Sequence, residues 1–179
     1  MKQAKRTKWI LDYFHPTPNF PTSGIQFQWY ANLLRNPTAF RQAVKELADR
    51  YKDMHVDVIA GLDSRGFIFS SALAYEMKLP LILIRKPGKL PGATEKIEYA
   101  LEYGRNSLEI EKDSLRQGQR VVIVDDIIAT GGTAAASCSL VERLDAIVVE
   151  VACLAELTEL KGRDKIHHPV FSLITIDAK

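Results

Sequence analysis

The sequence predicts an α/β fold with a mainly parallel central sheet flanked by helices. Short apolar runs alternate with segments of helical periodicity along most of the chain, as in folds whose strands are joined by crossover helices. One run, residues 121–124, has no polar side chain, which suits a parallel strand buried on both faces. Two glycine-containing loops, 61–66 and 129–133, follow directly after such runs. Because ligands in these folds bind beyond the carboxyl ends of the strands, both loops are expected at one binding edge.

Local signals place the elements of the first half of the chain. Asn36 is a suitable N-cap with Pro37 at the first helical position. Apolar residues then recur at helical spacing, which predicts an amphipathic helix: Phe40, Ala43, Val44, Leu47, Ala48 and Tyr51. The other expected elements are a helix at 5–14, an irregular proline-rich stretch at 16–24, a strand at 56–60, a helix at 67–77 and a strand at 81–84.

The second half begins with a long excursion over residues 85–113, where the composition changes to Lys, Pro, Gly, Glu and Tyr. No helix fits this segment. We expect two strands in it, near 98–103 and 108–111, joined at Gly104-Arg105-Asn106. The later expected elements are strands at 120–124, 146–154 and 170–176, with helices at 133–144 and 159–165.

Composition indicates one soluble domain over residues 1–179, of which 46% are hydrophobic and 26% charged. A net charge of +2 argues against a nucleic-acid or membrane partner. The first apolar stretch is interrupted by Asp12 and stopped by Pro16, too short for a signal peptide or a membrane span. Cys138 and Cys153 lie in apolar segments, so we expect buried thiols and a cytoplasmic location. The four histidines lack the spacing of metal ligands.

The most informative segment is residues 121–133, where an apolar strand meets two adjacent carboxylates, Asp125 and Asp126. Carboxylates at the end of a buried strand are costly unless they meet hydroxyls, cations or solvent. The loop that follows is made of small residues: Ala129, Thr130, Gly131, Gly132 and Thr133. It opens onto a helix N-terminus, whose N–H groups and dipole attract a phosphate. Acids for sugar hydroxyls beside amides for a phosphate predict a ribose-5-phosphate site, rather than an acidic surface turn.

Two established phosphate-binding motifs do not fit the chain. The loop at 129–133 has no lysine for a Walker-type site and lacks the Gly-x-Gly-x-x-Gly dinucleotide fingerprint. The loop at 61–66 has the glycine spacing of a P-loop, but Phe67 and Ile68 stand where Lys and Ser or Thr would be. We interpret it as a second anion loop with Arg65 as its cation; the alternative is a surface ion pair of Arg65. Arg85, Lys86 and Lys89 add a basic cluster, which alone would be equally consistent with a solvated surface.

Residues 122–133, Val-Ile-Val-Asp-Asp-Ile-Ile-Ala-Thr-Gly-Gly-Thr, closely resemble the phosphoribosyl-pyrophosphate motif of the type I phosphoribosyltransferases. Three further segments narrow the resemblance to the adenine phosphoribosyltransferase family: Gly-Leu-Asp-Ser-Arg-Gly-Phe at 61–67, Ile-Arg-Lys-Pro-Gly-Lys-Leu-Pro at 84–91 and Leu-Glu-Tyr-Gly at 101–104. Their order and spacing match that family from about Phe20 to Ile176. The resemblance implies the type I phosphoribosyltransferase fold. It also implies magnesium-dependent transfer of phosphoribosyl from phosphoribosyl pyrophosphate to N9 of adenine, giving AMP and pyrophosphate.

The resemblance also implies a role for each matching position on the donor side. Asp125 and Asp126 would hold the ribose hydroxyls, and residues 129–133 the 5′-phosphate. Glu102 would be the catalytic acidic group and Tyr103 a cover over the donor, both on a flexible β-hairpin lid within 85–113. The residues implied for pyrophosphate are Asp63, Ser64, Arg65, Lys86 and Lys89. The bond between Asp63 and Ser64 is expected to be a cis peptide, Mg²⁺ is expected to arrive with the donor rather than on protein side chains alone, and the family is usually homodimeric.

On the base side, residues 1–35 would form an N-terminal hood. The implied contacts of the base are Ile25, Gln26, Phe27 and Leu157, although Leu157 could equally be a core residue. Gln28 and Trp29 stand where the family usually has Arg and Asp, and Ser23 and Ser70 replace a usual proline and glycine. Two alternatives to adenine transfer therefore remain open. One is a phosphoribosyltransferase for another purine; the other is a non-catalytic regulator that senses phosphoribosyl pyrophosphate, which the retained Glu102 argues against.

Overall fold

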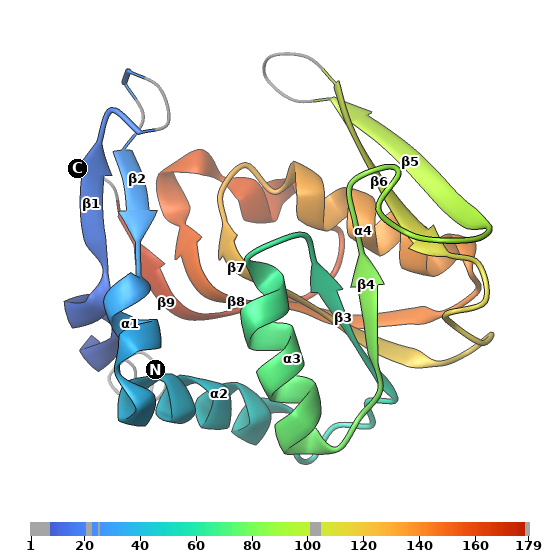
Figure 1. Cartoon of the computed structure of the whole chain (residues 1–179), viewed down its shortest axis with the longest axis horizontal. Helices are drawn as coiled ribbons and strands as arrows, with labels where there is room; N and C mark the ends of the chain where they lie inside the picture. The colour runs from blue at the N-terminus through green and yellow to red at the C-terminus, as the bar shows by residue number, and fades with distance from the viewer. Residues whose placement is uncertain (1–7, 21–22, 25, 101–104, 178–179) are drawn as a thin grey trace.

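A five-stranded parallel sheet forms the centre of the protein, in the strand order β4-β3-β7-β8-β9 (Figure 1). The computed structural model describes residues 8–20, 23–24, 26–100 and 105–177. The strands are β3 (Val58–Leu62), β4 (Leu81–Ile84), β7 (Arg120–Ile128), β8 (Ile147–Leu157) and β9 (Val170–Ile176). The predicted α/β class with a mainly parallel sheet is confirmed.

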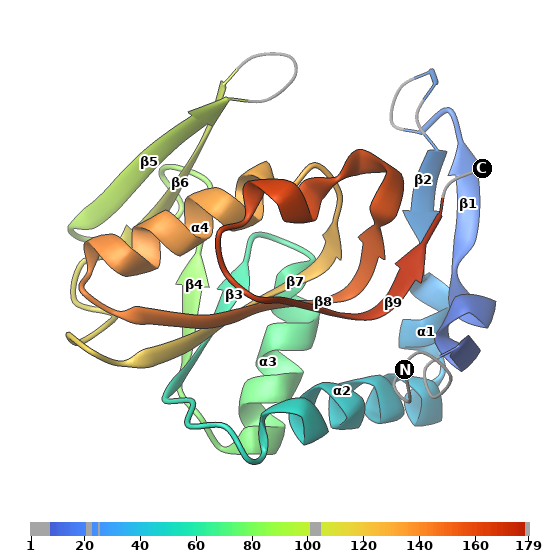
Figure 2. The ribbon, with the colours of Figure 1, turned by 180° about the vertical axis from the view of Figure 1, so that it is seen from behind.

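Helices cover both faces of this sheet, and the alternation of side chains along β7 sorts the core into two clusters. Val122 and Val124 pack toward α2 (Pro37–Tyr51) and α3 (Gly66–Met77). Val121 and Ile123 pack toward α4 (Gly132–Arg143), which lies on the opposite face (Figure 2). The apolar run of β7 is therefore buried on both sides, as its composition predicted. None of the described helices is both long and apolar enough to cross a membrane.

The predicted cap of α2 is confirmed in atomic detail. Asn36 Oδ1 accepts hydrogen bonds from the N–H groups of Thr38 and Ala39, both at 3.1 Å, and Pro37 occupies the first helical position. These contacts satisfy donors that a helix start would otherwise leave unpaired. A short helix, α1 (Ala31–Arg35), precedes this cap and joins α2 to the N-terminal segment.

The N-terminal segment differs from expectation. The first described element is a 3₁₀ helix, η1 (Lys8–Tyr13), rather than an α-helix at 5–14, of which residues 5–7 lie outside the described residues. The stretch expected to be irregular contains an antiparallel pair, β1 (His15–Pro18) and β2 (Gln26–Trp29). The prolines of this stretch led to the wrong prediction of an irregular coil. Proline is tolerated here because both strands of a two-stranded ribbon are edge strands.

The excursion after β4 forms a second antiparallel pair, β5 (Thr94–Ala100) and β6 (Arg105–Glu111). Its first strand begins earlier than the predicted 98–103, because Ile97 and Tyr99 alternate inward and pack against the core beside α4. Arg105 and Asn106 lie within β6 rather than in the turn. In Figure 1 the β1–β2 and β5–β6 hairpins stand at opposite ends of the sheet, beyond the carboxyl ends of its strands.

Two boundaries near the binding edge also differ. β7 continues to Ile128, so both aspartates lie inside the strand and not after it. The helix expected at 159–165 is two 3₁₀ turns, η2 (Thr158–Leu160) and η3 (Gly162–Lys165). These turns place Gly162 beside the loop that follows β7.

Candidate active site

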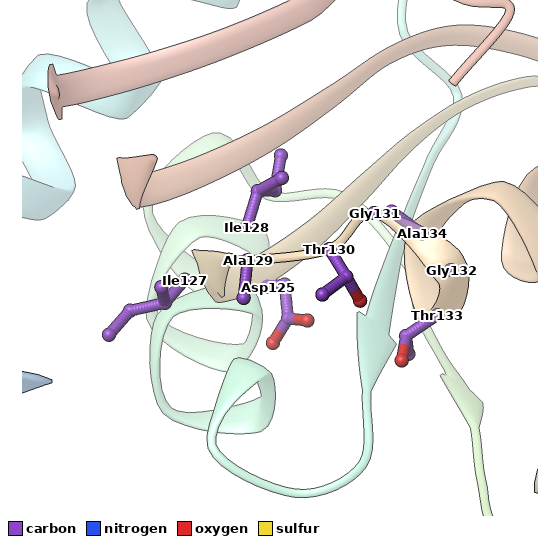
Figure 3. A pocket seen from close by; sticks show the side chains of 9 residues that line it. All are labelled: Asp125, Ile127, Ile128, Ala129, Thr130, Gly131, Gly132, Thr133 and Ala134. Carbon is purple, nitrogen blue, oxygen red and sulfur yellow. The ribbon is translucent and has the colours of Figure 1, made fainter. Parts of the chain in front are cut away.

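A pocket of about 90 Å³ lies where β7 gives way to α4 (Figure 3). It is lined by Asp125, Ile127, Ile128, Ala129, Thr130, Gly131, Gly132, Thr133 and Ala134. Gly131 is the N-cap of α4 and has a left-handed backbone with φ of 78°, a conformation that glycine adopts without strain. The first N–H groups of α4 have no carbonyl of their own helix to bond. The predicted loop therefore forms a polar pocket at a helix N-terminus that can hold one phosphate.

Gly162 packs against the loop at residues 129–133, a contact that the sequence did not reveal. A Cβ atom on Gly131 would lie 2.0 Å from the carbonyl oxygen of Gly162, and a Cβ atom on Gly162 would lie 2.1 Å from that of Ala129. The two backbones touch because neither residue has a side chain. The only sequence signal was a glycine within a segment of helical composition, which is commonly a site of close approach.

Asp125 lines the pocket, and its Oδ1 atom accepts a hydrogen bond from the N–H group of Asp126 at 2.8 Å. Burial, and then the charge of Asp126, raise the pKa of Asp125 well above its usual value. Gly66, at the start of α3, packs against it: a Cβ there would lie 3.0 Å from Asp125 Oδ1. The second glycine loop and the acidic pair thus meet at one edge, as predicted.

Asp126 is enclosed by side chains of the N-terminal segment and of the loop before α3. It is 3% exposed, and its Oδ2 atom accepts hydrogen bonds from Tyr30 Oη at 2.9 Å and from Arg65 Nε at 2.7 Å. The guanidinium of Arg65 also lies over the ring of Phe27, 4.8 Å from its centroid. Arg65 therefore forms an ion pair with Asp126, a buried residue predicted for the site, and not with a surface carboxylate. Tyr30 was missed by the sequence analysis, because a tyrosine in a hydrophobic segment gives no signal of its partner.

The remaining residues predicted for pyrophosphate surround Asp63. The Asp63–Ser64 peptide bond is cis, as expected. Asp63 Oδ2 accepts from Arg85 Nε at 3.2 Å and from the N–H group of Lys86 at 3.5 Å. The N–H group of Lys89 bonds Glu109 Oε1 at 3.0 Å. Backbone hydrogen bonds thus fix the basic segment 85–89, while Lys86 and Lys89 themselves are exposed.

Glu109 is an anchor for this basic segment that the sequence did not indicate. It is buried, and it accepts hydrogen bonds from the N–H groups of Lys89 and Leu90 and contacts Lys96 Nζ at 3.4 Å. Burial alone would raise the pKa of Glu109, but these donors lower it. The carboxylate therefore stays charged and holds the segment 89–90 beside β6.

On the base side, Gln26 and Phe27 lie in β2, with Phe27 facing Arg65. The ring of Trp29 is 47% exposed and lies 5.8 Å from that of Phe27, whereas Gln28 is buried. Leu157 ends β8 and is half-buried, not part of the closed core. Ile25, Glu102 and Tyr103 lie outside the described residues, so their predicted roles stay predictions.

The β5–β6 hairpin contacts the pocket at residues 129–133. Tyr99 Oη in β5 lies 3.1 Å from Thr133 Oγ1 in the first turn of α4. At the other end of this helix, Arg143 bonds Glu95 Oε1 at 3.1 Å and the carbonyl of Lys96 at 2.8 Å. The helix α4 therefore both borders this pocket and anchors strand β5 of the hairpin.

The described residues include two thiols and no cluster of metal-binding side chains. Among them, no group of three or more His, Cys, Asp or Glu side chains could hold a metal ion. Cys138 and Cys153 are free and buried, as predicted. Burial, followed by the charge of Glu142, raises the pKa of Cys138 to about 12, and burial also raises that of Cys153.

The parallel sheet, the acidic pair and the small-residue pocket at a helix N-terminus define a protein that binds a phosphorylated ribose, the class of the phosphoribosyltransferases. Residues 30–179 match the phosphoribosyl transferase domain family. More narrowly, the chain belongs to the adenine phosphoribosyltransferase family. It is 50% identical over 166 residues to adenine phosphoribosyltransferase of Roseiflexus castenholzii, covering 92% of this chain and 96% of that protein.

Solved structures agree with this assignment. Adenine phosphoribosyltransferase from Thermoanaerobacter pseudethanolicus superposes with a TM-score of 0.92 at 44% identity, covering 95% of this chain and 99% of that one. The Trypanosoma brucei enzyme, in complex with AMP, pyrophosphate and ribose-5-phosphate, gives 0.88 at 33% identity, covering 98% and 81%. The prediction of an adenine phosphoribosyltransferase, a transferase, is confirmed.

Proposed function

We propose that this protein transfers the 5-phosphoribosyl group from phosphoribosyl pyrophosphate to N9 of adenine, releasing AMP and pyrophosphate in purine salvage. The observation that carries this proposal is the pocket at 129–133 with Asp125 in its wall. Membership of the adenine phosphoribosyltransferase family supports the same chemistry. So do the ligands of the Trypanosoma brucei relative, which are AMP, pyrophosphate and ribose-5-phosphate.

The 5′-phosphate occupies the pocket, and the two aspartates receive the ribose hydroxyls. N9 of adenine attacks the anomeric carbon while the bond to pyrophosphate breaks, and its electron pair leaves with that group. The transition state resembles an oxocarbenium ion, which Glu102 stabilises; the same group can take the N9 proton. Arg65, Lys86 and Lys89 offset the charge of the departing pyrophosphate.

Mg²⁺ is assigned to the donor, because this ion binds proteins through one or two carboxylates together with substrate phosphates and keeps several waters. The pocket fits that pattern, since Asp125 supplies a carboxylate in its wall. When bound, the ion supplies charge neutralisation at the pyrophosphate. The lid hairpin closes over the donor and excludes water, so that adenine rather than water captures the ribosyl cation.

We also propose a homodimer in the cytoplasm. The solvent face of α3 exposes Ile68 and Tyr75, the latter 87% exposed, while Phe69 and Leu73 on its other face are buried. A helix that is apolar on both faces commonly has a partner on each, and a second copy of the chain is the partner assigned here. Free, buried cysteines suit a reducing compartment.

The choice of purine base is the part of this proposal to test first, because the aromatic rings of Phe27 and Trp29 lie side by side in the segment proposed to contact the base. Pyrophosphate release should be measured with phosphoribosyl pyrophosphate, Mg²⁺ and each of adenine, hypoxanthine, guanine and xanthine. Turnover with adenine alone supports the proposal. Turnover with another purine would assign specificity to Gln28 and Trp29, and donor binding without turnover would indicate a sensor.

A further inference from the structure

We propose that Tyr30 is a positioning residue, whose buried hydroxyl holds the Asp126 carboxylate in the orientation that receives a ribose hydroxyl. This inference rests on the proposed function, because it assigns a new residue to the same donor site. Tyr30 follows directly after β2 in the hood and is 1% exposed. Its Oη atom nevertheless reaches β7, where it donates to Asp126 Oδ2 at 2.9 Å.

Asp126 needs such a donor because of where β7 places it. Successive side chains of a strand point to opposite faces, so Asp126 shares the face of Val122 and Val124, beneath the hood, while Asp125 lines the phosphate pocket. A carboxylate that is 3% exposed is strongly destabilised without hydrogen-bond donors. Tyr30 and Arg65 supply two of them.

The two hydrogen-bond donors, Tyr30 and Arg65, differ in how firmly the surrounding residues hold them. The ring of Tyr30 is enclosed by aromatic neighbours, with centroids 5.7 Å from Phe14 and 5.7 Å from Phe69. The Arg65 side chain is 35% exposed, and the proposed function assigns it to pyrophosphate as well. Tyr30 can therefore keep its bond to Asp126 while Arg65 turns toward the leaving group.

Both donors use the same oxygen, Oδ2. Neither Tyr30 nor Arg65 bonds Oδ1 of Asp126. Fixing Oδ2 therefore aims Oδ1 as the acceptor for a ribose hydroxyl. Burial, and then the charge of Asp126, raise the pKa of Tyr30 well above its usual value, so the phenol stays protonated and remains a donor across the physiological pH range.

The chain contains a matched control for this geometry, far from the donor pocket. Tyr51 is also fully buried and donates from Oη to a buried carboxylate, Glu150 Oε2, at 2.9 Å. An arginine, Arg50, pairs with the same carboxylate at 2.8 Å. Removing the Tyr51 hydroxyl therefore has a similar structural effect without touching a residue assigned to the donor.

The test compares Tyr30→Phe with Tyr51→Phe, each of which keeps the ring and removes only the hydroxyl. We measure kcat, KM for each substrate, thermal stability, and calorimetric affinity for ribose-5-phosphate. Tyr30→Phe should raise KM for phosphoribosyl pyrophosphate and the dissociation constant of ribose-5-phosphate by about tenfold, as expected for a lost bond to a charged group. KM for adenine should stay within about twofold. Tyr51→Phe should lower thermal stability. It should leave KM for phosphoribosyl pyrophosphate and the dissociation constant of ribose-5-phosphate unchanged.

Unchanged donor affinities in Tyr30→Phe, or an equal loss in Tyr51→Phe, would overturn the inference in favour of a purely structural hydroxyl. Failure of the proposed function is distinguished by the unaltered protein, which would then bind ribose-5-phosphate but release no pyrophosphate with adenine. In that case a weaker affinity of Tyr30→Phe for ribose-5-phosphate still supports the role of Tyr30. An unaltered protein that does not bind ribose-5-phosphate would refute both.

Discussion

A Cβ atom on Gly61 would lie 2.2 Å from Oγ of Ser70, so that β3 and α3 touch at a point with no room for a side chain. Ser70 Oγ is buried, and among the described residues it has no hydrogen-bond partner. The family resemblance placed a glycine at this position of α3. The serine is therefore accommodated only because Gly61 faces it.

Ser70→Ala should raise the free energy of unfolding in urea by about 1 kcal/mol, because it removes a buried hydroxyl without a partner. Gly61→Ala should lower it by about 1–3 kcal/mol through overpacking. The double variant Gly61→Ala/Ser70→Gly should recover most of that loss, since the clashing atoms Oγ and Cβ are gone. The single variant Ser70→Gly completes the cycle, and strictly additive effects of Gly61→Ala and Ser70→Gly would show that the two residues do not compete for the same space.

Gly162→Ala should displace the phosphate loop, since its Cβ would overlap the carbonyl oxygen of Ala129. We expect kcat/KM for phosphoribosyl pyrophosphate to fall at least about tenfold, corresponding to loss of one good phosphate contact. Gly118→Ala is the control, because Gly118 has a φ of 79° but no atom within 4 Å of an added Cβ. It should cost stability and leave donor kinetics intact. Equal kinetic defects in both variants would remove Gly162 from the site.

Asp125→Asn should stabilise the free protein and lower its affinity for phosphoribosyl pyrophosphate. Because the pKa of Asp125 is higher in the folded protein than in the unfolded chain, its carboxyl contributes stability at low pH. That contribution is lost as the pH rises through the folded value. The substitution should remove this pH dependence and raise Tm at pH 7 by a few degrees. Scanning calorimetry from pH 4 to 8 measures it, and parallel profiles for both proteins would contradict the cause given.

Glu102→Ala should lower kcat by at least about 100-fold while donor affinity stays within a few-fold, if Glu102 acts only at the transition state. Glu102→Gln should cause a similar loss while keeping the size of the side chain, because an amide can neither accept the N9 proton nor carry the stabilising charge. Asp113→Ala, at an exposed carboxylate just beyond β6, should change neither parameter. An unchanged kcat for Glu102→Ala would exclude it from the mechanism.

Tyr75→Asp should shift the protein from dimer to monomer, because a charge on the exposed apolar face of α3 opposes its burial against a second copy. Sedimentation velocity at micromolar concentration is the measurement. Met54→Asp, at a 38% exposed apolar residue after α2, serves as the control and should leave the assembly unchanged. Identical sedimentation of all three proteins would place the interface elsewhere.

Local patterns predicted most of the central sheet and its helices. The cap at Asn36 and the apolar run before Asp125 each act within a few residues, so their signals are present in the sequence. The β1–β2 hairpin was missed because its strands are stabilised by pairing across at least seven intervening residues, from Pro18 to Gln26 at the nearest. Its prolines also suggested a coil. Strand ends were also displaced, because pairing with β8 extends β7 past both aspartates.

The site was predictable where one segment carries the chemistry, as at residues 129–133. It was not predictable where function depends on partners distant in sequence. Tyr30 lies 96 positions from Asp126, and Gly162 reaches the loop at Gly131 through a turn after β8. Neither residue type indicates its partner, and only the folded sheet brings each pair together.

The two buried thiols make this protein convenient for spectroscopy. Cys138 and Cys153 are enclosed, and their raised pKa values leave almost no thiolate at neutral pH. Maleimide and iodoacetamide reagents should therefore pass over both while the fold is intact. Cysteines introduced on β1 and β5 would accept a donor and an acceptor dye in the otherwise unaltered sequence. The separation between hood and hairpin then becomes a fluorescence signal that can be followed within single turnovers.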